Sequence, residues 1–252
     1  MQDRFSRSLL CLIMLILTSP SAAHAEFRGH PDLASKAPTT KTIFVVSPQI
    51  DIYELGAGGQ SEAIPEWSQI ARSNVRQAPL NEFAKREQLH VTAWDEQVLA
   101  PALRSNYEQS LLLFNIVSEA ILTHAISWQN VRPGVRTAFF PEKARSFTYS
   151  LGKDVTELAP DADAFLLVRG FDQRSTSGRK ALGVLATLIG GGGNAARLRG
   201  GNLFSATLVD AKTGDVLWFT YTLKPFDPRD LEDAQKLVVE FMIDLPTLGQ
   251  TP

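Results

Sequence analysis

The sequence predicts an α/β fold: a single domain in which a mixed β-sheet of about five strands is flanked by helices. Two observations carry this prediction. Short runs rich in β-branched and aromatic residues alternate with longer stretches of helical periodicity over residues 41–245. Near the carboxyl end, two such runs flank a short polar turn, which is typical of an antiparallel hairpin, and a C-terminal helix closes the domain.

The first 25 residues have the order of a secretory signal peptide. Arg4 and Arg7 precede an apolar run, and Ala23-His24-Ala25 forms a small-x-small triplet. The apolar run is much shorter than the roughly 20 residues that a membrane-spanning helix needs. We therefore expect cleavage after Ala25, export to the periplasm and a mature chain that begins at Glu26.

The composition of the mature chain narrows the classes of function. Export leaves 227 of the 252 residues and removes two bases and one acid, so the net charge changes from −2 to −3. A near-neutral chain has no general attraction for nucleic acid. The only cysteine, Cys11, lies in the predicted signal peptide. The expected mature chain therefore has no disulfide, no cysteine ligand for a metal and no lipid-attachment cysteine.

The first half of the domain is expected to run strand, helix, strand, long helix. Residues 26–40 are polar and hold two prolines, which indicates a flexible leader. TIFVVSP, beginning at Thr42, is typical of a buried strand, and a glycine-containing loop follows it. The pattern then predicts a helix from Pro65, a strand over QLHVTAW, and a long helix from Asp95 to Thr123 or beyond.

The second half is expected to supply the centre of the sheet and its closing elements. ADAFLLVRGF is the strongest strand, because it is apolar on both faces. Residues 178–201 form a glycine-rich apolar insertion, and NLFSATLVD and DVLWFTYTL then flank a turn held by Gly214, since glycine accepts a positive φ. A last helix runs from about Pro228 to Ile243, with acids in its first turn, and residues 246–252 form a tail.

The closing hairpin carries a resemblance to known families. Its pattern is made by Ala206, Leu208, Val209, Asp210, Thr213, Gly214, Val216 and Trp218. It resembles the hairpin of the curli-secretion channel family, of outer-membrane lipoproteins that activate penicillin-binding proteins, and of the amino-terminal domain of the Tol-Pal translocation protein. The resemblance implies a small mixed sheet flanked by helices, without a catalytic site, that docks onto other envelope components.

The residues that most often carry chemistry form no recognisable motif. His30, His90 and His124 are far apart and have no metal-ligand spacing, which favours structural roles. The sequence has no G-x-S-x-G elbow and no catalytic cysteine. GAGG at residues 56–59 gives only part of the dinucleotide fingerprint, so a connecting loop is the favoured interpretation. We expect no cofactor, no metal and no catalytic residue.

The insertion at residues 178–201 is the candidate contact site. Its four consecutive glycines lack the lysine that a phosphate-binding Walker loop needs. An apolar arm bounded by bases suits contact with a membrane surface or a protein partner, whereas a pore-forming hairpin and a loop packed on its own domain are the alternatives. The candidate contact residues are Arg179, Leu182, Leu185, Leu188, Ile189, Arg197 and Arg199.

Two classes of function stay open. The first is a non-catalytic periplasmic or envelope accessory protein that acts through protein contacts in envelope assembly or secretion. Its partners would be envelope proteins, a membrane surface or further copies of this chain, and not nucleic acid. The second is a small-ligand-binding or hydrolytic protein with a site in the Gly56–Gly59 and Val131–Phe140 loops. A deep pocket holding acids and a histidine would favour the second class, and a shallow surface with an exposed apolar loop the first.

Overall fold

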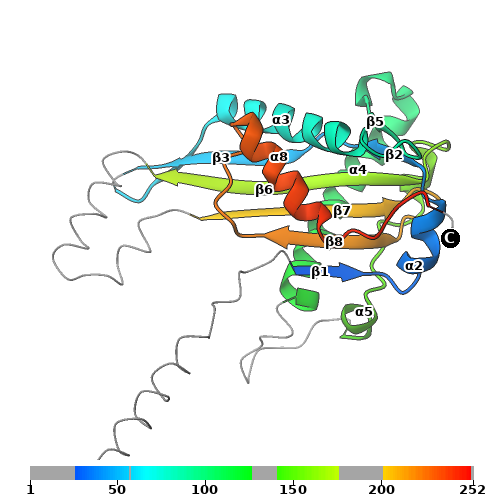
Figure 1. The fold of residues 1–252 in the computed structure, drawn as a ribbon. Coiled ribbons are helices and arrows are strands. Elements are labelled where there is room, and N and C mark those ends of the chain that lie inside the picture. The colour runs from blue at the N-terminus through cyan, green and yellow to red at the C-terminus, as the bar shows by residue number, and fades with distance from the viewer. Residues whose placement is uncertain (1–25, 57, 127–140, 176–200, 251–252) are drawn as a thin grey trace, which may run out of the picture.

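The computed structural model describes residues 26–56, 58–126, 141–175 and 201–250 (Figure 1). It confirms the mixed α/β class, with eight strands in one sheet where the sequence indicated about five. The strands are β1 (Glu26–Gly29), β2 (Thr42–Val45), β3 (Gln49–Leu55), β4 (Ser61–Ala63), β5 (His90–Ala93), β6 (Ala164–Ser175), β7 (Asn202–Asp210) and β8 (Val216–Thr222).

The helices fall into three long ones and several short ones. The long helices are α3 (Pro65–Phe83), α4 (Pro101–Ala120) and α8 (Leu231–Met242). The short elements are the α-helices α2 (Leu33–Lys36) and α5 (Pro141–Ser146), the 3-10 helices η1 (Ala37–Thr39), η2 (Glu96–Val98) and η5 (Asp154–Glu157), and the π-helical turn η3 (Ile121–Ile126), which extends α4. No helix among the described residues is both long enough and apolar enough to cross a membrane.

Strand β6 is the centre of the sheet and divides it into two halves. On one side β2 and β3 both pair with β6 in parallel, one after the other along its length, and β5 pairs in parallel with β2. On the other side β7, β8 and β1 follow in antiparallel order. The sheet is therefore mainly parallel on one side of β6 and antiparallel on the other, as the helix-rich first half and the closing hairpin predict.

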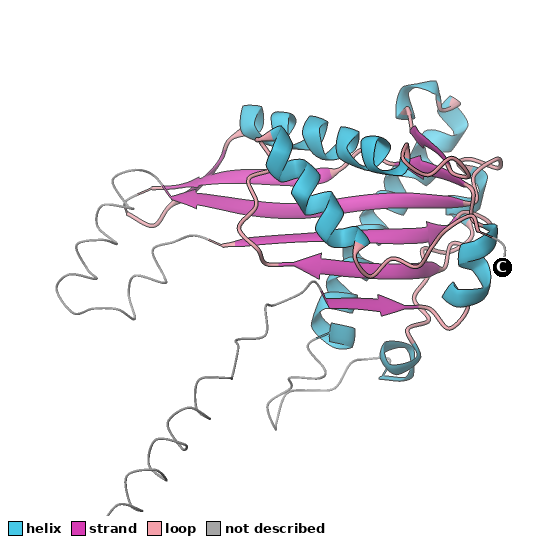
Figure 2. Ribbon diagram, in the orientation of Figure 1, coloured by secondary structure: helices cyan, strands magenta, loops and turns pink. Residues whose placement is uncertain are grey.

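Helices cover both faces of the sheet, which gives three layers (Figure 2). Successive residues of β6 alternate between two hydrophobic cores: Leu166 and Val168 belong to one, and Phe165 and Leu167 to the other. The first core is closed by α3 and α8, and the second by α4 with η3. This double coverage explains why β6 is apolar on both faces.

Residues 26–40 are folded, which corrects the expectation of a flexible leader. Strand β1 pairs with β8 along its whole length, and Leu33 and Ala37 are buried in the core beneath α3 and α8. The tail is also packed: Leu248 is fully buried, and the Gly249 amide donates a hydrogen bond to the Ala37 carbonyl at 3.0 Å. A few buried apolar residues anchor these polar segments, which average composition does not reveal.

The region after β2 is likewise a strand rather than a loop. In β3, Ile50 and Ile52 are fully buried and alternate with polar residues, the pattern of a strand with one covered face. Pro48 separates β3 from β2, and the Val46 amide between them still donates to the Leu166 carbonyl at 3.0 Å. The two strands thus act as one interrupted strand beside β6.

The β7–β8 turn contains Gly214 with a φ of +77°. A Cβ at this position would lie 2.1 Å from the Gly152 carbonyl oxygen, so both the backbone conformation and the available space require glycine. The Asp210 carboxylate accepts hydrogen bonds from the amides of Lys212 and Thr213, at 2.7 and 3.0 Å, and closes the turn.

Candidate functional site

The sequence-predicted contact residues lie outside the described part of the chain. They are Arg179, Leu182, Leu185, Leu188, Ile189, Arg197 and Arg199. The strands that lead into and out of this segment are described: Asp172 on β6 pairs with Asn202 on β7, and the Gln173 amide donates to the Gly201 carbonyl at 2.8 Å. The insertion therefore connects two neighbouring antiparallel strands.

The glycine loop at residues 56–59 is the turn of the β3–β4 hairpin. The Gly56 amide donates to the Gln60 carbonyl at 2.9 Å, and the Gly59 amide donates to the Gly56 carbonyl at 3.0 Å. A dinucleotide loop instead runs from a strand directly into a helix N-terminus. The second half of the alternative ligand site, Val131–Phe140, lies outside the described residues.

Of the three histidines after residue 25, two make short-range polar contacts with residues two positions along the chain. The Nδ1 atom of His30 accepts a hydrogen bond from the Asp32 amide at 3.1 Å, and the Nε2 atom of His90 is 3.3 Å from the Thr92 hydroxyl. His124 lies in η3. Within residues 26–56, 58–126, 141–175 and 201–250, no three His, Cys, Asp or Glu side chains are grouped so that they could hold a metal ion.

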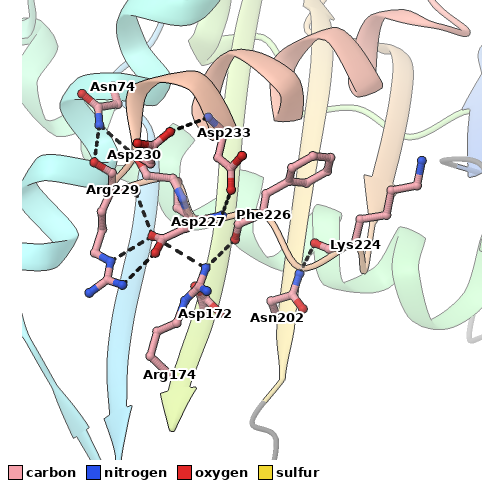
Figure 3. A network of polar contacts seen from close by, with 11 residues as sticks. Asn74, Asp172, Arg174, Asn202, Lys224, Phe226, Asp227, Arg229, Asp230 and Asp233 are labelled. Atoms are coloured by element: carbon pink, nitrogen blue, oxygen red, sulfur yellow. Dashed lines mark hydrogen bonds and ion pairs between the residues drawn. The ribbon is translucent and has the colours of Figure 1, made fainter. Parts of the chain in front are cut away.

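A network of charged residues joins the end of β6 to the loop before α8 (Figure 3). Asp172 is buried, and its carboxylate accepts a hydrogen bond from Nε of Arg174. The Nη2 atom of Arg174 donates to the Phe226 carbonyl at 2.6 Å and lies 3.6 Å from Oδ1 of Asp227. One arginine on β6 therefore contacts the loop at two points through Nη2, while its Nε is held by Asp172 on the same strand.

The loop end of the network is equally well paired. Arg229 donates two hydrogen bonds to the Asp227 carboxylate, at 2.9 and 2.7 Å, and its guanidinium lies over the Trp67 ring, 4.3 Å from the centroid. The side-chain amide of Asn74 donates from Nδ2 to the carbonyls of Pro228 and Arg229, at 3.1 and 2.9 Å. Residues of α3 and β6 thus fix the loop from both sides.

The pKa shifts in this network follow from its geometry. Burial raises the pKa of Asp172, and the Arg174 charge and hydrogen bond oppose that rise. The hydrogen bonds from Arg229 hold the pKa of Asp227 below its ordinary value, and the same contact raises the pKa of Arg229. Each cation has an acid, so the network is saturated and is best explained as a structural anchor.

A second polar cluster lies where β2 and β5 end. The Oε2 atom of Glu96 accepts hydrogen bonds from the Ser47 hydroxyl at 2.8 Å and from the Tyr107 hydroxyl at 3.1 Å. Burial, and then the neighbouring Glu96, raise the pKa of Tyr107 well above its usual range, so the phenol stays protonated and donates. Arg76 of α3 reaches the same place and donates to the Trp94 carbonyl.

This second cluster was not found by sequence reasoning. Adjacent acids before a helix are typically explained by capping and solvation, but the structure gives Asp95 and Glu96 different roles. Asp95 caps η2 by accepting a hydrogen bond from the Gln97 amide at 2.9 Å, while Glu96 turns inward to Tyr107. The long helix α4 begins only at Pro101.

Helix α4 also carries an apolar ridge, defined here as Leu112, Leu113 and Ile116. Their exposed fractions are 64%, 36% and 66%, although the helix already buries Phe114 and Tyr107 on its inner side. The run LLLF at residues 111–114 contains more leucine than a single buried stripe needs. That surplus was the sequence signal for the ridge.

Comparison with known proteins adds little. No family model matches the sequence, and none of the curated proteins matches it. Two structures of the PelC dodecamer from Paraburkholderia phytofirmans align at 12% sequence identity. Their TM-scores are 0.36 and 0.35, and the alignments cover 91% and 90% of this chain and 100% and 97% of the PelC chains. Similarity at this level carries no argument about fold or function.

Proposed function

We propose that this chain is an exported, non-catalytic accessory protein of the bacterial envelope that acts through protein contacts, the first of them with a second copy of itself. The observation that carries this proposal is the α4 ridge. Three adjacent large aliphatic side chains on one solvent-facing helix surface are the usual mark of a contact site, whereas isolated exposed ones are common.

A second copy fits the ridge in charge as well as in hydrophobicity. Consider two copies of α4 that pack antiparallel and cross at Leu112. A residue eight positions before Leu112 on one copy then lies close to the residue seven positions after Leu112 on the other copy. These two residues are Arg104 and Glu119, which are both exposed and opposite in charge. Two-fold symmetry repeats the pair on the other side of the crossing.

The position of α4 leaves the ridge accessible among the described residues. The helix covers the face of the sheet opposite to α3 and α8, and lies behind the sheet in Figure 1. Its inner side packs on the second core through Phe114 and Tyr107, so the ridge can bury surface on another molecule without disturbing its own domain.

The proposal includes export and a second contact surface. The charged start, the apolar run and the Ala23-His24-Ala25 triplet support export to the periplasm, and β1 begins at Glu26, the first residue of the proposed mature chain. The hairpin resemblance to envelope proteins supports the same compartment. The insertion is the proposed contact with an envelope protein or membrane surface, through Arg179, Leu182, Leu185, Leu188, Ile189, Arg197 and Arg199.

Sedimentation equilibrium of the chain from Glu26 tests the self-contact. We expect a reversible dimer, and a monomer with an unchanged melting temperature for the double substitution Leu112→Glu, Ile116→Glu. The matched control is Val239→Glu, Ile243→Glu, which adds the same two charges at the same spacing, in the last turn of α8 and at its C-cap, and should leave the dimer intact. A monomeric wild-type chain, or equal loss of the dimer in both variants, contradicts the proposal.

A further inference from the structure

Arg76 is a partly buried cation that lacks the partners such a group normally has. Its Nη2 atom donates to the Trp94 carbonyl, while its Nε atom is buried without a hydrogen-bond partner. Among the residues that the structure describes, no carboxylate forms an ion pair with it. A guanidinium has five N–H donors, and buried donors are nearly always satisfied. The arrangement is that of a site prepared for an acceptor.

Arg76 lines a solvent-open hollow of about 770 Å³ between α3, the start of β3 and the start of α4. This size suits a small organic molecule. Arg72, one helical turn before Arg76, lines the same wall and is fixed by hydrogen bonds to the Ile50 carbonyl and to Asp51, at 2.8 and 2.6 Å. Asp51 also lines the hollow and compensates the charge of Arg72, so Arg76 is the cation that remains to attract an anionic group on the ligand.

The opposite wall offers acceptors and neutral polar groups. Both hydrogen bonds to the Glu96 carboxylate go to Oε2, from Ser47 and Tyr107, and Oε1 has no partner among the described residues. Gln49 also lines the hollow, and Ser73 does so from the α3 side. Such groups recognise hydroxyls, which both donate and accept hydrogen bonds.

We propose that this hollow binds a small hydroxylated carboxylate. The carboxylate accepts from the guanidinium of Arg76, beside the Arg72–Asp51 pair, and a hydroxyl donates to Oε1 of Glu96. Tyr107, kept protonated as a donor, and Ser47 hold Glu96 in place as positioning residues. The inference is independent of the α4 self-contact, because none of the ridge residues lines the hollow.

Isothermal titration calorimetry of the chain from Glu26 tests this site with four probes: glycerate, acetate, glycerol and inorganic phosphate. We expect glycerate to bind at least about tenfold more tightly than acetate or glycerol, since it alone offers both the anion and the hydroxyls. Arg76→Gln should weaken glycerate binding at least about tenfold. Arg86→Gln removes the same charge from the segment after α3, outside the hollow, and should leave glycerate binding unchanged.

A third variant, Arg72→Gln, keeps the test sharp if Arg76→Gln fails to fold, because Arg72 lies on the more exposed part of the wall. It should also weaken glycerate binding. Absence of glycerate binding, binding that survives both the Arg76 and the Arg72 substitutions, or equal weakening by Arg86→Gln would overturn the proposal. Tighter binding of inorganic phosphate than of glycerate would also overturn it, in favour of a phosphorylated ligand.

Discussion

Helices α8 and α4 cover opposite faces of the same sheet, but they differ in the contacts that fix them to the domain and in the side chains that they expose. The side chain of Asp230 caps α8 by accepting a hydrogen bond from the Asp233 amide at 3.0 Å, and the Asp227–Arg229 pair anchors the preceding loop. Helix α4 has no side-chain cap, and begins with Pro101 after Ala100. Helix α8 is therefore fixed by polar contacts with its own domain, and α4 mainly by its buried apolar stripe.

The outer surfaces of the two helices differ in the same sense. Val239 on α8 and Ile243 at its C-cap are 46% and 56% exposed, but Lys236 of the same helix forms ion pairs with Glu232 and Asp233. The α4 ridge has three aliphatic side chains together. The difference teaches that one helix presents a surface suited to water, while the other presents a surface that gains from being covered.

The Asp227–Arg229 pair and its contact with Arg174 anchor the loop before α8. Asp227→Asn breaks this anchor and should have the largest effect on stability. Removing this charge leaves Arg229 and part of Arg174 without their carboxylate, and should lower the free energy of unfolding at neutral pH by about 1–2 kcal/mol. Urea denaturation measures the change. The control is Glu232→Gln, which removes an acid from an exposed ion pair of the same region and should have no measurable effect. Equal effects would mean that the anchor is no more than a surface ion pair.

The pH dependence of stability should show two opposing contributions from this anchor. The lowered pKa of Asp227 stabilises the fold above its unfolded-state value of about 4, and this contribution is lost as the pH falls through the lower folded-state pKa. The raised pKa of Asp172 acts in the opposite direction: its stabilising contribution is present below about pH 4 and is lost as the pH rises through the folded-state pKa.

Two variants separate these contributions in urea denaturation between neutral and acidic pH. Asp172→Asn should abolish the part of the profile in which stability rises on acidification, and Asp227→Asn should abolish the part in which it falls at still lower pH. Profiles that stay parallel to the wild type for both variants would show that neither carboxylate is shifted by folding.

A smaller effect is expected from the charges beside the α4 ridge. Arg104→Glu places like charges together across the antiparallel pair, and should weaken the dimer several-fold. Adding Glu119→Arg restores opposite charges and should recover most of the affinity in sedimentation equilibrium. Recovery should be incomplete, because Glu119 also lies 3.8 Å from Arg169 of its own chain. If Arg104→Glu leaves the affinity unchanged, the antiparallel register is wrong.

Much of the fold could be predicted from local sequence pattern. Strand β6 is apolar on both faces, and the β7–β8 hairpin combines alternation with a glycine turn, so both are visible without tertiary information. Strand β3 was missed because prolines and glycines flank it, although Ile50 and Ile52 alternate with polar residues. Strand β1 has only four residues, and its partner β8 is almost two hundred residues away.

The candidate sites were harder to predict, for physical reasons. Ser47, Arg76, Glu96 and Tyr107 come from four separate elements, and only the packing of α3 and α4 against the ends of β2 and β5 brings them together. In the sequence alone, Tyr107 fits the buried stripe of its helix, and the other three look like ordinary cap or surface residues. For the α4 ridge, the sequence shows more leucines than one buried stripe needs. It does not show which of them are exposed, because that depends on which side of the helix the sheet covers.

Disulfide cross-linking through a single cysteine at position 112 tests the central claim most directly. The chain from Glu26 contains no cysteine, so Leu112→Cys introduces the only thiol into it. At the crossing point of an antiparallel α4 pair, the two copies of this thiol face each other, within reach of a disulfide. Mild oxidation should give a covalent dimer from Leu112→Cys in high yield and almost none from the similarly exposed control Ile243→Cys at the C-cap of α8. Similar low yields from both variants, or a higher yield from Ile243→Cys, would contradict assembly through α4.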